Sequence, residues 1–201
     1  MPPESLMSES RSDRPYHHGD LAPALRQAAR QILEEEGLEA LSLRSVARRA
    51  GVSHAAPYRH FPSREALLAE LAVAGFEELR GEIAKAAAAP GALPDRIARV
   101  GAAYARFGAR QSGLLRLMFS AEFPNRAQIP ALAGATESIG QEIGSVIGNP
   151  IVGLAVWAAV HGLTMLSIDN MIDLGQRQAG LNVLPSRAEI LLRSLFSEPL
   201  Q

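Results

Sequence analysis

The spacing of apolar residues constrains the fold of this chain more than any other feature. Apolar side chains recur at steps of three and four residues along most of the 201-residue sequence, as at Leu21, Leu25 and Ile32. This period places them on one face of an α-helix. No segment alternates apolar and polar residues in the way that indicates a β-strand, and no internal repeat is found. A hydrophobic content of 47% allows such helices to bury a core. We therefore expect an all-α fold.

Capping residues define two helices near the N-terminus. Asp20 can cap the first helix, and Gly37 can end it because glycine adopts the left-handed conformation that closes many helices. Ser42 can cap a second, short helix that runs from Leu43 to Ala50. Gly51 follows directly and allows a sharp turn, since a left-handed residue is least strained without a Cβ atom.

Two more serines start the next predicted helices. Ser53 can cap a third helix, and Ser63 can cap a fourth that runs from Arg64 toward Ala84. The stretch "AAAAPGALPD", at 86–95, is then the clearest boundary in the chain because its Pro-Gly pair and second proline interrupt a helix-forming run.

Helical spacing continues beyond this boundary. Ile97, Val100, Tyr104 and Phe107 would share one face of the next helix. Ser186, followed by Glu189 three residues later, forms a capping box that we expect to open the last helix. Further apolar or amphipathic segments lie between these two, over 112–124, 131–147 and 151–168.

The composition limits the classes of protein that need to be considered. Without cysteine, a disulfide scaffold and a thiolate metal site are excluded, and an intracellular, cytoplasmic protein is favoured. Residues 1–16 contain no apolar run, so we do not expect a secretory signal there. The segment 151–168 is nearly long enough to cross a bilayer, but it contains His161 and Thr164 and lacks flanking basic residues. A helix buried in a core or a subunit interface is the preferred interpretation, with no membrane partner.

Arginines gather in one stretch of a chain whose net charge is only −1. Between Leu41 and Arg64 there are five arginines and no acidic residue, whereas glutamates flank the stretch on both sides. A local basic island of this kind is the electrostatic footprint of a phosphate backbone. Alternatively, the arginines pair with the flanking acids on a solvated surface, and charge alone favours neither interpretation.

The same stretch has the layout of a helix-turn-helix. The small side chain of Ala47 and the turn at Gly51 let the third helix cross the second closely, and the second helix of such a motif enters the major groove of DNA. The segment "GVSHAAPYRHF" then carries many hydrogen-bond donors and no acid, which suits acceptor-rich base edges and phosphates. Pro57 lacks the N–H that would bond to the Ser53 carbonyl, so we expect a bent or irregular first turn.

The segment "LSLRSVARRAGVSHAAPYRHFPSREALLAELA", Leu41 to Ala72, resembles the DNA-binding region of the tetracycline-repressor (TetR) family of transcriptional regulators. The "AGVS" turn, the Tyr-x-x-Phe ending and the "SREALL" start of the fourth helix carry the resemblance, and "YHHGDL" extends it toward the N-terminus. Further on, "VWAAVHGL" resembles a Trp-x-x-x-His-Gly signature in the regulatory domains of one branch of that family.

The resemblance implies an all-α chain of two functional parts. A polar tail would cover residues 1–15, a three-helix helix-turn-helix DNA-binding domain 16–64, a connecting helix 65–89, and a larger regulatory and dimerisation domain 90–201. Tyr16, His17 and His18 could form an N-terminal arm along the duplex. The residues that the resemblance assigns to DNA contacts are Arg44, Ser45, His54, Ala55, Tyr58, His60 and Arg64.

Family members are homodimers that usually hold a small molecule in the second domain. The resemblance therefore implies a double-stranded operator with half-sites about one DNA turn apart, roughly 34 Å. Two helices, Pro150 to Ile172 and Ser186 to Phe196, could pair with those of a second copy. Each residue proposed for an effector pocket could, taken singly, also belong to an ordinary core. The proposed residues are Tyr104, Phe107, Met118, Phe119, Phe123, Trp157, His161 and Met165.

The preferred function is that of a ligand-responsive repressor that binds a pseudo-palindromic operator and is released by a small, largely apolar effector. An enzyme is disfavoured because the histidines and carboxylates form no metal-binding pair at i, i+4 spacing on one helix, and the sequence has no glycine-rich phosphate loop and no nucleophile elbow. We accordingly assign no catalytic residue, metal or cofactor. The remaining alternative is a helical protein-interaction adaptor that does not bind DNA.

Overall fold

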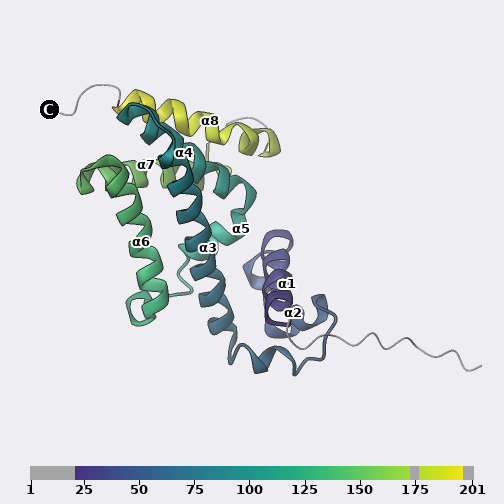
Figure 1. The fold of residues 1–201 in the computed structure, drawn as a ribbon. Coiled ribbons are helices and arrows are strands. Elements are labelled where there is room, and N and C mark those ends of the chain that lie inside the picture. Colours follow the sequence, from purple (N-terminus) through teal and green to yellow (C-terminus); the bar gives the residue numbers. More distant parts are fainter. Residues whose placement is uncertain (1–20, 173–176, 197–201) are drawn as a thin grey trace, which may run out of the picture.

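The structure is a computed structural model that describes residues 21–172 and 177–196. Within these ranges it contains eight α-helices, three short 3-10 helices and no strand (Figure 1). The expected all-α fold is therefore confirmed. Asp20 and the proposed arm at 16–18 lie outside the described residues.

The N-terminal unit follows the predicted caps closely up to residue 51. Ser42 caps α2 by accepting a hydrogen bond from the Ser45 N–H at 3.0 Å, and the Ser45 hydroxyl in turn accepts one from the Ser42 N–H at 2.9 Å. Gly37 and Gly51 both adopt positive φ angles, 84° and 69°, as the turns require. The elements of this unit are α1 (Leu21–Glu35), η1 (Leu38–Ala40), α2 (Leu43–Arg49) and η2 (Pro57–Arg59).

The expected third helix is where the sequence prediction is wrong. Only Pro57–Arg59 is helical, and it forms a 3-10 turn rather than an α-helix. The Ala56 N–H bonds to the Ser53 carbonyl, but Pro57 has no N–H to continue an α-helical pattern. The chain instead makes three-residue bonds, such as His60 N–H to the Pro57 carbonyl at 3.0 Å. The irregularity extends through the whole segment and is not confined to its first turn.

Helix α3 (Arg64–Ala88) links the two halves of the molecule. Ser63 caps it through the Ala66 N–H, as predicted, and the helix continues to Ala88. In Figure 1 it leaves the N-terminal unit at the lower end and runs through the second unit between α4 and α6. Its buried residues include Leu71, Phe76 and Ile83, so a continuous apolar face joins both units.

The second unit is a bundle of five helices, of which α4, α5 and α6 pack on α3 while α7 and α8 pack on α4. Asn149 caps α7 by accepting hydrogen bonds from the first N–H groups, Ile151 and Val152. The proline at the start of α7 lacks an N–H that would in any case be unpaired there. The elements are α4 (Leu93–Arg110), α5 (Ser112–Met118), η3 (Arg126–Gln128), α6 (Pro130–Ile147), α7 (Pro150–Ile168) and α8 (Arg177–Phe196).

The capping box expected at Ser186 and Glu189 does not open the last helix. Helix α8 begins at Arg177 and passes through Pro185. A proline inside a helix costs about 3 kcal/mol because it removes one hydrogen bond and crowds the preceding turn. Burial on both sides of the proline offsets this cost, since Leu184 and Leu192 are fully buried, and Leu192 packs where a Cβ on Gly101 of α4 would stand.

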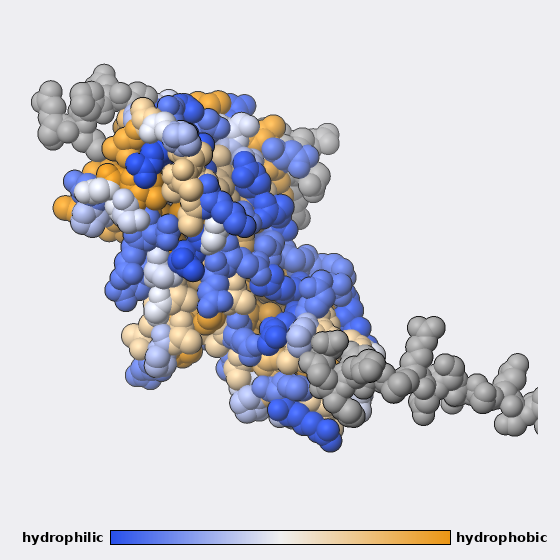
Figure 2. All heavy atoms as spheres, viewed as in Figure 1, coloured by the Kyte–Doolittle hydropathy of each residue, from blue (hydrophilic) through white to orange (hydrophobic). Residues whose placement is uncertain are grey.

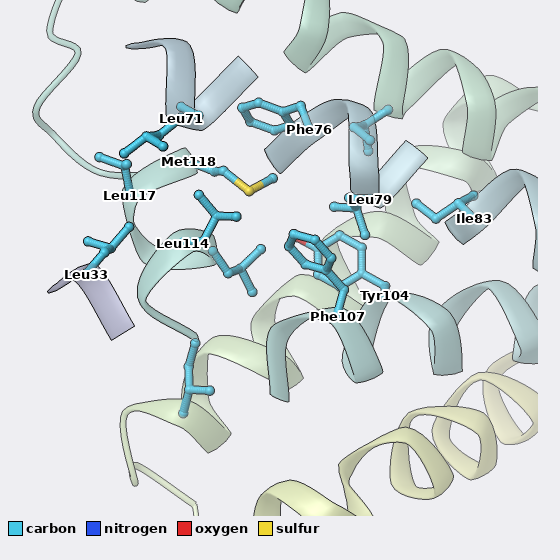
Figure 3. Packing of buried hydrophobic residues seen from close by; sticks show 14 of the residues in the cluster. Leu33, Leu71, Phe76, Leu79, Ile83, Tyr104, Phe107, Leu114, Leu117 and Met118 are labelled. Atoms are coloured by element: carbon cyan, nitrogen blue, oxygen red, sulfur yellow. The ribbon is translucent and has the colours of Figure 1, made fainter. Parts of the chain in front are cut away.

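One hydrophobic core runs through the molecule (Figure 3). Leu33 of α1 faces Leu114 and Leu117 of α5, while Met118 reaches toward Phe76 of α3. Buried side chains from α1, α3, α4 and α5 belong to the same cluster. Because this cluster is closely packed, a displacement of helices in the second unit would also move α1.

Helix α7 has two apolar faces. Val156, Val160 and Ile168 are buried, whereas Ile151 is 79% exposed and Leu154 62%. By length and composition alone, α7 is the one described helix that could cross a membrane, and a third of its apolar stretch is buried within the fold. This is weak evidence for a membrane span, since core helices of globular proteins have the same length and composition. The strongest apolar colouring in Figure 2 lies at the end of the molecule that holds α7 and α8.

Candidate DNA interface and effector region

Most of the side chains expected to contact DNA are exposed to solvent. His54, Ala55 and His60 are exposed, and Tyr58 is 54% exposed. Beneath them Val46, Pro57 and Phe61 are buried and fix the segment on the N-terminal core. The 3-10 geometry therefore changes the path of the backbone but still presents donors outward.

Most arginines of the basic island between Leu41 and Arg64 are not neutralised by acidic side chains within the described residues. Arg44, Arg48 and Arg59 are exposed and form no ion pair with any residue in the described part of the chain. Arg49 differs because it pairs with Glu35 at 2.7 Å and with Glu36 at 2.5 Å. The alternative in which flanking acids neutralise the whole island thus applies to Arg49 but not to the three outward arginines.

Two of the seven assigned residues have partners inside the protein. Ser45 is buried, and its hydroxyl donates toward the backbone carbonyl of Ala40 at 2.8 Å in addition to its role in the α2 cap. In this conformation Ser45 shapes the start of α2 and does not present its hydroxyl to solvent.

Arg64 holds three points of the fold together. Its Nε donates to the Leu41 carbonyl at 2.8 Å, and its Nη2 donates to the Leu38 carbonyl at 3.2 Å. Its Nη1 forms an ion pair with Glu122 at 2.8 Å, and both side chains are about 29% exposed. The guanidinium therefore ties η1 to the segment after α5, and a phosphate would have to compete with Glu122 for it.

A second contact joins the two units at α1. The Glu34 carboxylate accepts hydrogen bonds from the Gly113 and Leu114 N–H groups at 2.9 and 2.8 Å, and so caps α5 from outside. The backbones approach closely here, because a Cβ atom on Gly113 would lie 2.5 Å from the Leu33 carbonyl oxygen. Sequence reasoning missed this contact, since its partners are about 80 residues apart.

The residues proposed for an effector pocket form a packed cluster in the second unit. Tyr104, Phe107 and Met118 are fully buried and Phe123 nearly so, whereas the others are partly buried. Two of them contact His161: its ring centroid lies 4.3 Å from that of Phe119 and 6.1 Å from that of Tyr104. Partly buried members of the set are Phe119, Trp157, His161 and Met165.

One polar group sits at the centre of this cluster. The Tyr104 hydroxyl and His161 Nδ1 lie 2.8 Å apart and share a hydrogen bond. Burial raises the pKa of the Tyr104 hydroxyl and lowers the pKa of His161, so both side chains are neutral at physiological pH. The Trp157 indole N–H lies beside the same hydroxyl but is a buried donor without a hydrogen-bond partner among the described residues.

A groove of about 690 Å³ lies between α6 and α7. Trp157 is the one member of the proposed pocket set that lines it, with the far edge of its indole 3.5 Å from where a Cβ on Gly140 would stand. The groove opens to solvent and is walled mainly by apolar atoms. Its remaining lining residues are Thr136, Glu137, Gln141, Gly144, Ser145, Gly148, Pro150 and Leu154.

No cluster of three His, Cys, Asp or Glu side chains that could hold a metal ion occurs within residues 21–172 and 177–196. Most ion pairs of this part of the chain instead join separate elements, as Arg116 of α5 does with Asp169, directly after α7, at 2.7 Å.

Comparison with known proteins identifies the DNA-binding part. Residues 25–71 match the model of a family described as bacterial regulatory proteins, tetR family. No curated protein matches the chain. Three of the similar solved structures illustrate the relationship, and each covers most of both chains.

A protein of unknown function from Rhodococcus sp. RHA1 is 29% identical, with a TM-score of 0.64 over 89% of this chain and 98% of that one. A regulatory protein of the tetR family from Rhodococcus RHA1 is 21% identical, with a TM-score of 0.60 over 86% and 95%. FadR from Bacillus subtilis, solved in complex with stearoyl-CoA, is 12% identical, with a TM-score of 0.68 over 85% and 97%.

The family match over residues 25–71, together with the all-helical fold, supports the class of DNA-binding transcriptional regulators. The chain carries the DNA-binding domain of the tetR family at residues 25–71, followed by a larger helical domain with the fold of these regulators. The resemblance noted in the sequence is thus confirmed. The Trp-x-x-x-His-Gly assignment and the division at residues 15, 64 and 89 stay predictions.

Proposed function

We propose that the protein is a cytoplasmic, ligand-responsive repressor that binds a pseudo-palindromic operator as a homodimer. The observation that carries this proposal is the exposure of His54, Tyr58 and His60, in a stretch whose three exposed arginines form no ion pair within the described residues. Unpaired cations near hydrogen-bond donors suit a phosphate backbone flanking readable base edges.

The dimer is proposed from the apolar surface at the other end of the molecule. Leu166, Ile190 and Leu195 are 44%, 58% and 54% exposed, and they extend the apolar stripe that Ile151 and Leu154 begin on α7. Exposed apolar patches of this kind mark association sites in globular proteins. Pairing of α7 and α8 with those of a second copy would bury the stripe and form a four-helix interface.

The effector is proposed to act through α5. FadR, with the same fold, has been solved with stearoyl-CoA, so the fold can hold a small molecule that is largely apolar. In the present chain, a ligand that shifts the cluster around Phe119 and Phe123 would disturb the segment that carries Glu122 and the start of α5. Both contact the N-terminal unit, through Arg64 and Glu34. A ligand acts in this way only if it binds one state more tightly than the other.

Gel-shift titration on the DNA next to the protein's own reading frame, at several salt concentrations, tests the proposal. Arg44→Ala and Tyr58→Phe should each weaken binding, and loss of one phosphate contact should flatten the salt slope by about one unit. Full affinity in both variants would refute the assigned surface. Absence of any salt-dependent DNA binding by the wild-type protein would favour the adaptor instead.

A further inference from the structure

Arg187 is an exposed cation on the apolar face of α8 and forms no ion pair within the described residues. It lies four residues after Val183 and three before Ile190, so the three side chains share one side of the helix. Val183 is 39% exposed and Ile190 58%. A guanidinium in the middle of a face that becomes covered loses water, and this loss is compensated only if the covering surface supplies an acid.

Neither α7 nor α8 can supply this acid. Helix α7 contains no Asp, Glu, Lys or Arg. The one acidic residue of α8, Glu189, already pairs with Arg193 at 2.9 Å. Directly after α7, Asp169 pairs with Arg116 at 2.7 Å. An acid opposite Arg187 must therefore come from an element that flanks the face formed by α7 and α8.

Glu137 of α6 is the acid that remains. From α4 to α8, every other acid within the described residues pairs with a cation, as Glu142 does with Arg80 at 3.8 Å. Glu137 is exposed and accepts a hydrogen bond only from the neutral Gln141 amide, at 3.0 Å. Its negative charge is thus not compensated by any side chain of the described part of the chain.

The groove between α6 and α7 places Glu137 beside the apolar stripe of α7. Glu137 and Leu154 both line this groove. Leu154 is 62% exposed and Ile151 79%, and together they begin the stripe that the proposed dimer buries. Gly140 and Gly144 leave room in the groove for side chains of a second copy. The surface to be covered therefore continues from α7 into the groove, and Glu137 has the place of a polar rim residue.

We propose that the dimer sets Arg187 of each copy against Glu137 of the other, so that the interface extends from α7 and α8 across the groove onto α6. This inference rests on the proposed homodimer and names the contact that fixes its register. In a twofold dimer each copy contributes Arg187 to one pair and Glu137 to the other, so two equivalent pairs form. Charges at a rim determine register and choice of partner, while burial of the apolar stripe supplies most of the affinity.

Charge reversal of either residue tests this contact. Glu137→Arg and Arg187→Glu each place like charges at both symmetric contacts, so the dissociation constant of the dimer should rise about 10- to 100-fold. Analytical ultracentrifugation of the full-length protein measures it. Because both side chains are exposed, circular dichroism should show an unchanged fold. The double variant restores opposite charges with their signs exchanged and should return to within about threefold of wild type.

Mixing the two singly reversed proteins separates a contact between copies from a contact within one chain. In the mixed dimer, the native Glu137 of one chain faces the native Arg187 of the other, and the two introduced side chains also carry opposite charges. The mixture should therefore dimerise about as tightly as wild type, although each variant alone dimerises weakly. Native mass spectrometry identifies the mixed dimer by its mass.

Arg106→Glu is the matched control for the reversals. Arg106 is exposed on α4 and forms no ion pair within the described residues. It lines a pocket with Leu181 and Pro185, which lie on the opposite side of α8 from Val183 and Ile190. The same change of charge there should leave the dimer unchanged.

Three results would overturn the proposal. They are unchanged dissociation constants in both reversed variants, an equal weakening in Arg106→Glu, and a mixture of the reversed proteins that stays monomeric. In each case a dimeric wild type would leave the proposed homodimer standing, with a different register. A wild-type protein that is monomeric at every concentration would overturn the homodimer as well and assign the face to another partner, so the two failures are distinguishable.

Discussion

Replacing Gly113 with alanine tests the contact through which the second unit holds α1. The added Cβ atom would stand 2.5 Å from the Leu33 carbonyl oxygen and 3.0 Å from its carbonyl carbon. Because these are backbone atoms of a packed helix, α1 and α5 must move apart. Overpacking of this kind costs about 1–3 kcal/mol, which lowers the melting temperature by roughly 2–12 °C at 2–4 °C per kcal/mol.

Gly81→Ala supplies the matched control for this substitution. Gly81 lies inside α3 with no atom within 4 Å of an added Cβ, so alanine should stabilise the helix by about 0.5–1 kcal/mol. Thermal unfolding followed by circular dichroism gives both values, and gel shift shows whether operator affinity falls in Gly113→Ala alone. If both variants unfold alike and bind DNA alike, α5 does not hold α1, and the coupling derived from it is wrong.

Three other perturbations address separate parts of the molecule. Glu122→Gln removes the carboxylate that pairs with Arg64. Gel shifts should then show tighter DNA binding, with a salt slope steeper by up to about 0.9 per added phosphate contact. An unchanged slope would mean that Arg64 has a purely structural role. Pro57→Leu restores an N–H four residues after Ser53. Far-ultraviolet circular dichroism should therefore show more helix, and footprinting should show an altered contact with the operator. An identical spectrum would contradict the explanation that Pro57 causes η2. His161 has a pKa lowered by burial, so the unfolded chain takes up a proton more readily. Stability should be complete above the unfolded pKa of about 6.5 and fall as the pH drops below it. Denaturant titrations of wild type and His161→Gln should show a smaller loss in the variant, and parallel losses would exclude His161 as the source.

Local chemistry made much of the N-terminal unit predictable. Ser42 and Ser63 cap the helices assigned to them, and Gly37 and Gly51 turn the chain where a positive φ was expected. Pro57 was identified as a disturbance, but its extent was underestimated. Loss of one N–H in a segment of only a few residues leaves too few hydrogen bonds to propagate an α-helix.

Other features depend on tertiary packing that no local pattern expresses. The start of α8 was placed at Ser186 because Ser186 and Glu189 have the spacing of a capping box, yet the helix begins earlier and burial of Leu184 and Leu192 sustains it through Pro185. Periodicity marked Tyr104 and Phe107 as inward-facing, but it does not distinguish a filled core from a cavity. The groove between α6 and α7 arises from the spacing of glycines and from the position of a neighbouring helix.

The length of α3 has a mechanical consequence. At 1.5 Å per residue its 25 residues form a rod of about 37 Å. If the bundle tilts this rod by about 5° at its distal end, the opposite tip swings sideways by roughly 3 Å, close to the 3.4 Å rise of one base pair. A rearrangement too small to unfold anything in the bundle would thus be magnified into a displacement of the reading surface by about one step along the double helix.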